Sequence, residues 1–195
     1  SPRTRGLSLF RVRAEPLRQT HQRSLREALG DPRYQQLTGE FAAWLDDHAW
    51  REALDEEQRE RLAQPALDFA TPLLGRDHRR VEKQGAAFAE LSTADRHRLR
   101  IRIKELRYAL DFFASLYPAP PVKVYLSALA RLQDSLGIMN DIAVARRLLD
   151  EARLRTVSAA RQVIEGWYGC RLDVQERAFP ALWRDFTACE RPWKD

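Results

Sequence analysis

The residues best able to do chemistry lie in one run of cations and apolar side chains, HRLRIRIKELRYALDFF, at residues 97–113. On a helix of 3.6 residues per turn, four nitrogen-bearing side chains of this run share one arc. These four, called the basic stripe, are His97, Arg100, Lys104 and Arg107. Arginine forks and lysine ammonium groups in a row favour oxyanions such as phosphate. The stripe therefore predicts a site for a polyanion.

The basic stripe is not predicted to lie opposite the core face of its helix. Leu99, Ile103 and Leu106 mark that core face, and the stripe is centred about 120° from it, with apolar residues on both flanks. We therefore expect the stripe to line a groove or the inside of a bundle. Its like charges repel one another, and partial burial strengthens the repulsion. Either a bound anion or structural salt bridges to other helices must offset this repulsion. The spacing of the residues alone does not decide between the two.

Two further sets of polar residues are candidates for the same site. In the preceding segment, Arg76, Arg80 and Lys83 share a face, with Arg79 beside them. A solvated surface is the simpler interpretation of this row. Gln133 and Asn140 project beside leucines of a later helix, and Arg147 continues their face. A buried amide without a partner costs about 1–3 kcal/mol. We expect the two amides to form hydrogen bonds between helices, which would also orient the arginines.

The elements that must position these residues are helices separated by prolines and short breaks. Proline or glycine is expected to start, bend or end helices at Pro16, Gly30, Pro72, Gly75 and Gly137 and around Pro118–Pro121. No β-type alternation stands out. The predicted fold class is all-α, a helical bundle of long antiparallel helical hairpins. Residues 1–10 are expected to be a disordered lead-in or a cloning remnant, and residues 11–195 one helical domain.

Composition excludes several classes of protein. The 195 residues carry 33 Lys and Arg against 28 Asp and Glu, a net charge of +5 too small to prove an anionic partner. Two cysteines, Cys170 and Cys189, are too few for a disulfide framework or zinc knuckle. No apolar run reaches the roughly 18 residues of a membrane span, and no signal peptide is recognised. These features predict a cytoplasmic protein without membrane association, metal or cofactor.

The segment HRRVEKQGAAFAEL, the run at residues 97–113 and the following LARLQDSLGIMNDIAVARRLL together resemble the conserved histidine α-helical domain, the CHAD family. The resemblance spans roughly residues 65–150. It implies an all-helical bundle of two pseudo-symmetric halves around a basic pore that binds inorganic polyphosphate. Carried over by position, it assigns polyphosphate to the basic stripe and to Arg79, Arg80 and Lys83. It assigns supporting roles to Tyr108, Gln133, Asn140 and Asp141.

The chain departs from the family pattern at its N-terminal side. The family's first half opens with its own His/Arg helix, H-x-x-R-x-x-x-(R/K)-x-x-R, followed by an L-x-x-x-R-D helix, and neither precedes Arg11. Residues 11–47 resemble a later helix pair of that half. The first helices are therefore expected to be missing, which leaves the pore open on one side. Pairing of two chains to close it is a hypothesis.

Three functions are compatible with these residues. Binding of polyphosphate without catalysis ranks first, with polyphosphate granules or a triphosphate tunnel enzyme as associated partners that the resemblance suggests. Binding of RNA or single-stranded nucleic acid ranks second, because Tyr108 is the only aromatic on the stripe while Phe112 and Phe113 are predicted to be core. A phosphohydrolase or a phosphohistidine carrier through His97 ranks third, because no carboxylate cluster or glycine-rich phosphate loop accompanies the cations.

Overall fold

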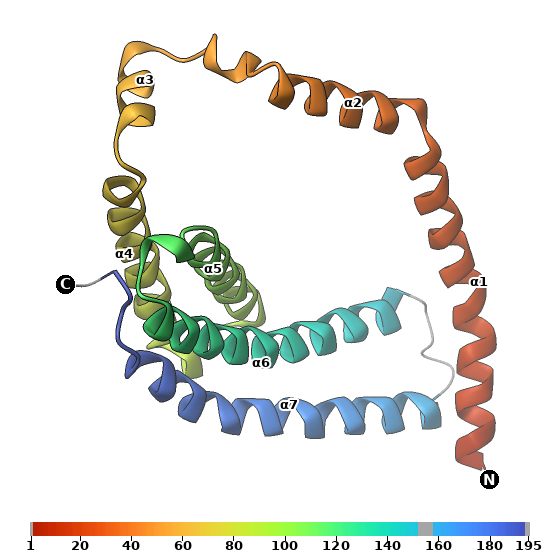
Figure 1. The fold of residues 1–195 in the computed structure, drawn as a ribbon. Coiled ribbons are helices and arrows are strands. Elements are labelled where there is room, and N and C mark those ends of the chain that lie inside the picture. The colour runs from red at the N-terminus through yellow and green to blue at the C-terminus, as the bar shows by residue number, and fades with distance from the viewer. Residues whose placement is uncertain (1, 152–157, 194–195) are drawn as a thin grey trace. The chain divides into compact units, whose positions relative to one another are not determined.

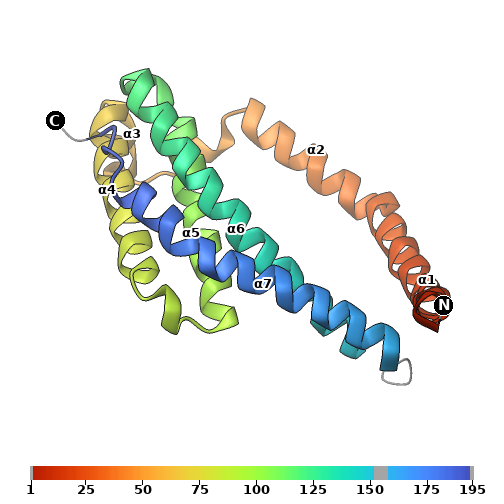
Figure 2. The ribbon, with the colours of Figure 1, turned by 90° about the horizontal axis from the view of Figure 1, so that it is seen from below.

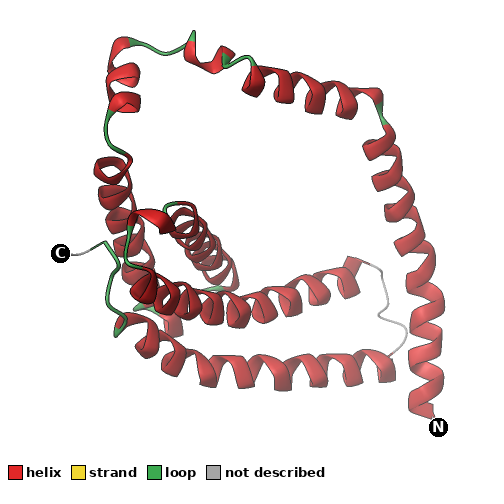
Figure 3. Ribbon diagram, in the orientation of Figure 1, coloured by secondary structure: helices red, strands yellow, loops and turns green. Residues whose placement is uncertain are grey.

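The computed structural model describes residues 2–151 and 158–193, which are helical almost throughout (Figure 1). Figure 3 shows helices and loops and no strand in this described part. The α-helices are α1 (Pro2–Gly30), α2 (Pro32–Asp46), α3 (Glu56–Ala63), α4 (Ala66–Gly85), α5 (Thr93–Phe112), α6 (Ala119–Glu151) and α7 (Ser158–Thr187). Short 3-10 helices lie at Ala49–Arg51, Phe88–Glu90 and Ala114–Leu116. The predicted all-α class is confirmed.

The chain divides into two compact units. The first unit contains α1, α2 and α3, and the second contains α4, α5, α6 and nearly all of α7. In the first unit, Asp31 caps α2 by accepting a hydrogen bond from the Arg33 amide at 2.8 Å, and Pro32 follows as the first helical residue. No residue of α2 or α3 is buried. The hydrophobic core therefore belongs to the second unit.

The second unit packs α5 against both α4 and α6, and α6 and α7 run antiparallel side by side in Figures 1 and 2. Its core is aliphatic along α5 and α6, where Leu99, Ile103 and Leu106 are fully buried. Phe179 of α7 stacks on Phe88, with ring centroids 3.6 Å apart. These are the antiparallel hairpins predicted from the sequence, and α5 presents the predicted core face to its neighbours.

Close packing of α4 on α7 depends on a glycine. A Cβ atom added to Gly85 would come within 2.1 Å of the Trp183 ring. Gly85 is buried at the end of α4, so only a residue without a side chain lets the indole approach there.

A polar group is built into the core between α4 and α6. The buried His78 shares a 2.6 Å hydrogen bond between its Nδ1 and the Tyr125 hydroxyl, and its Nε2 lies 3.4 Å from the Glu82 carboxylate. Burial, and after it the nearby Cys189, raises the pKa of the Tyr125 phenol above its ordinary value. The Tyr125 phenol is therefore held protonated in the folded protein.

Several breaks expected from proline and glycine do not occur. Helix α4 continues through Pro72 and Gly75, and α6 continues through Gly137. Pro120 and Pro121 lie in the first turn of α6, where the missing amide hydrogen is not needed. An interior proline removes one helical hydrogen bond, a loss that burial of a long helix face can outweigh.

The N-terminal segment also differs from expectation. Residues 2–10 belong to α1, which continues through Pro16, whereas the sequence suggested a disordered lead-in and a helix starting at Pro16. The hydroxyl of Thr20 donates to the carbonyl of Pro16 at 3.0 Å, one turn earlier. A single proline is thus accommodated inside this helix without ending it.

Candidate functional site

The basic stripe runs along the flank of α5 that faces α6. His97 shares a 2.8 Å hydrogen bond between its Nδ1 and Oδ1 of Asn140, and Arg107 Nε donates to Oε1 of Gln133 at 2.9 Å. The two predicted amides of α6 therefore hold the first and last members of the stripe. The predicted hydrogen bonds between helices are present, and they involve the cations themselves.

Arg100 lies between these two anchored residues, beside Gly137 of α6. A Cβ atom added at Gly137 would be 3.7 Å from Arg100 Nε, so the absence of a side chain there leaves room for the guanidinium. Arg100 Nε is buried and has no hydrogen-bond partner within the described residues. A buried guanidinium nitrogen without an acceptor is energetically costly, and no described residue offsets that cost for Arg100 Nε.

The stripe is short of counter-charge. Within residues 2–151 and 158–193, no Asp or Glu forms an ion pair with any of its four members. Arg100, Lys104 and Arg107 are half-buried, which reduces screening of their repulsion by water. The spacing left two interpretations open, a bound anion or structural salt bridges. The described structure contains no such salt bridge at the stripe.

The predicted second row on α4 is not brought to the stripe. Arg76 and Arg80 both contact Asp77, at 3.2 and 3.4 Å, while Arg79 and Lys83 are exposed. Arg80 and Asp77 also border a small pocket with two α5 residues, Arg102 and Glu105. These two lie on the flank of α5 away from the stripe and are exposed. The α4 cations are thus exposed, and Arg80 lies on the side of α5 away from the stripe.

The remaining predicted residues lie at the edges of the site. Tyr108 is 53% exposed, and the Arg107 guanidinium lies over its ring at 4.9 Å from the centroid. Asp141 and Arg147 are exposed on α6.

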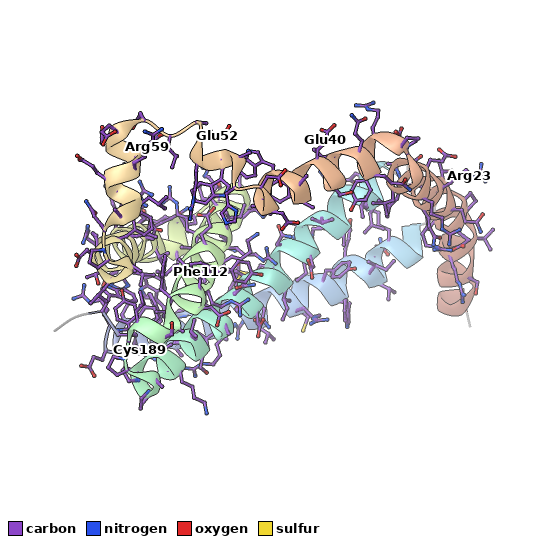
Figure 4. All side chains as sticks on the ribbon, turned by 45° about the horizontal axis from the view of Figure 1, so that its top comes forward. Arg23, Glu40, Glu52, Arg59, Phe112 and Cys189 are labelled. Carbon is purple, nitrogen blue, oxygen red and sulfur yellow. The ribbon has the colours of Figure 1, made fainter. Side chains whose placement is uncertain are left out.

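One prediction about α5 is wrong. Phe112, labelled in Figure 4, is 80% exposed, although it was expected to be a core residue. Phe113 is half-buried and packs edge-on against Phe69, with centroids 6.1 Å apart. The helix ends at Phe112, and its last turn carries this ring to the surface beside Tyr108, one turn earlier.

Two arginines near His97 were missed from the sequence. Arg96 forms an ion pair with Glu176 of α7 and covers the Phe88 ring at 4.8 Å. Arg146 of α6, rather than the adjacent Arg147, borders a small cavity with His97 and Asn140. The choice between adjacent arginines depends on the rotation of α6, which a charge pattern does not specify.

Metal-binding clusters and membrane-spanning helices are both absent from the part of the chain that the structure describes. No group of three or more His, Cys, Asp or Glu side chains there is placed to hold a metal ion. None of the described helices combines the length and apolar character required to cross a bilayer.

Comparison with known proteins shows similarity to a protein family and to solved structures. The sequence model of the CHAD domain family matches residues 1–150, a span that includes residues 1–10. Among solved structures, the crystal structure of the CHAD domain from the plant Ricinus communis is similar, with a TM-score of 0.75 and 30% sequence identity. The match covers 96% of this chain and 62% of that chain, so the chain spans less than two thirds of this relative's length. No curated protein matches the chain.

Proposed function

The chain belongs to the CHAD domain family, and we propose that it binds inorganic polyphosphate, without catalysis, along the basic stripe of α5. Two features of the stripe support this proposal. Gln133 and Asn140 hold two of its four cations in place, and none of the four forms an ion pair with an acidic residue in the described structure. A polyanion would supply the missing negative charge and the acceptor oxygens. The family resemblance of the sequence implies the same ligand.

The spacing of the stripe suits a linear anion better than a compact one. Side chains three or four residues apart recur about every 5 Å along the helix axis. Arg100 and Arg107 can fork onto phosphate oxygens, and Lys104 can act as a point charge. His97 can donate a hydrogen bond through Nε2 when its ring is protonated. Binding of this kind is driven largely by the release of condensed counterions.

The test is a binding titration with polyphosphate of defined length at several salt concentrations. The variant Arg100→Ala/Lys104→Ala should bind more weakly, and its plot of log affinity against log salt should be flatter by about 0.7 for each phosphate that is no longer neutralised. Arg177→Ala/Arg184→Ala removes two exposed cations from α7 and is the matched control, with the wild-type slope. Unchanged binding by the stripe variant would place the site elsewhere.

The exposed Phe112 favours a second candidate, the binding of single-stranded RNA. Tyr108 and Phe112 are one turn apart on α5 and exposed beside the stripe, where bases could stack on them. Competition between polyphosphate and single-stranded RNA at matched salt separates the two functions. Tyr108→Ala/Phe112→Ala should weaken RNA binding and leave polyphosphate binding unchanged if polyphosphate is the ligand. Preferential binding of RNA by the wild-type chain would contradict the first proposal.

Catalysis is not needed to explain this arrangement, since it contains cations and amides without a neighbouring nucleophile–base pair. A phosphohistidine at His97 is the specific alternative. Incubation with polyphosphate, followed by assays for released phosphate and for phosphorylated His97, tests it. Either product would replace the binding proposal with phosphoryl transfer.

A further inference from the structure

A small cavity lies at the His97 end of the basic stripe, between α5, α6 and α7. Its polar wall contains Thr93, Arg96, His97, Asn140 and Arg146, and Leu172 of α7 lies on the apolar side. The cavity volume is about 50 Å³, which holds a few water-sized groups. This volume accommodates a single tetrahedral oxyanion.

The charges around the cavity are unequal. Arg96 is already paired with Glu176 and packed on Phe88. Arg146 makes no ion pair with any described residue, and none of the residues that line the cavity is acidic. Asn140 holds the His97 ring at this position through the hydrogen bond to Nδ1. The cavity therefore combines one uncompensated guanidinium with an oriented imidazole and the Thr93 hydroxyl.

We infer that this cavity is a subsite for a terminal phosphate group, an inference that rests on the proposed binding of polyphosphate. His97 belongs to both the stripe and the cavity, so a chain lying along the stripe reaches the cavity at its end. A terminal phosphate carries close to two charges near neutral pH, as a phosphomonoester does, whereas an internal one carries a single charge. A second cation at the end of the stripe, Arg146, matches the additional charge.

The inference is tested by blocking the ends of the ligand. Wild-type chain is titrated with a short linear polyphosphate of defined length and with the same polymer whose terminal phosphates are converted to phosphoramidates by an amine. Arg146→Ala should lower the affinity for the free-ended polymer by about tenfold, the effect of losing one charge-assisted hydrogen bond. It should leave the affinity for the blocked polymer unchanged. Arg184→Ala removes an equal charge from an exposed position of α7 and controls for net charge.

The possible results separate this inference from the proposed function. Equal losses for both polymers in Arg146→Ala would show that Arg146 acts as a general cation and would overturn the terminal subsite, leaving the stripe proposal intact. Equal affinity of both polymers for the wild-type chain would overturn it as well. Failure of the wild-type chain to bind either polymer would overturn the proposed function itself. Far-UV circular dichroism of each variant verifies that the helices are retained.

Discussion

Individual amides decide how the cations of the stripe are held. From the sequence, Gln133 and Asn140 were predicted to bond between helices because an amide on an apolar face needs a partner. In the structure their partners are Arg107 and His97. A neutral amide orients a cation without cancelling its charge, which a carboxylate at the same position would do. The choice of amide over acid therefore keeps the stripe available to an external anion.

This role predicts the effect of Asn140→Asp. The nearly isosteric carboxylate should pair with His97 and neutralise part of the stripe, lowering polyphosphate affinity by about tenfold, or about 1.4 kcal/mol. The free energy of unfolding should not fall and should rise by less than about 1 kcal/mol, because a repulsion is relieved at a solvent-accessible pair. Titration and urea unfolding measure the two quantities. Gln162→Glu, an exposed charge change on α7, is the control; weaker binding with equal loss of stability would indicate misfolding instead.

A second residue-scale prediction concerns Tyr125 and pH. Its pKa is raised in the folded state, chiefly by burial, so below its ordinary value near 10 both states keep the proton. Above about pH 10 the unfolded state releases it first, and the free energy of unfolding should fall as pH rises. Urea unfolding should show a shallower fall for Tyr125→Phe than for wild type. The Cys189 thiol, whose pKa burial also raises, should leave a residual slope; identical slopes would contradict this role for Tyr125.

At the scale of elements, packing decides where glycine and proline matter. Pro16 and Pro72 were expected to start or bend helices, yet α1 and α4 continue through them. Gly85 instead matters because α7 places the Trp183 ring against it, a contact between elements distant in sequence. Helix-breaking tendencies are local, whereas a need for close approach is created only when two helices meet.

We therefore predict that Gly85→Ala destabilises the second unit by about 1–3 kcal/mol, because the added methyl group overlaps the rigid indole ring. Gly166→Ala is the matched control. No atom would lie within 4 Å of its Cβ, and alanine should stabilise α7 by up to about 1 kcal/mol. Thermal or urea unfolding followed by circular dichroism measures both. Equal stability of the two variants would show that the Trp183 ring moves aside without cost.

At the scale of the whole molecule, the first unit leaves an apolar helix face uncovered. Leu37 and Phe41 of α2 are 64% and 57% exposed, and Tyr34, Trp44 and Leu45 extend the same side. An isolated helix of 15 residues is marginal in water, and a contiguous exposed apolar face commonly marks an interface. We propose that a second copy of the chain covers this face.

Sedimentation should then detect a dimer at micromolar or higher concentrations. Phe41→Glu should dissociate it, whereas Gln35→Glu, the same added charge at an exposed polar position of α2, should not. Hydrogen exchange of the α2 amides should slow as protein concentration rises. A strict monomer with and without polyphosphate would contradict the pairing.

The sequence by itself determined the all-helical class, the core face of α5 and the basic stripe, because the spacing of side chains along one helix is a local property. It also carried the family resemblance. Only the tertiary structure decided that Arg80 pairs with Asp77 away from the stripe, that Phe112 is exposed and that Arg146 borders the cavity at His97. Each of these depends on how one helix is rotated and placed against another. That rotation results from the packing of buried side chains far apart in the sequence, and the charge pattern of a single helix does not contain it.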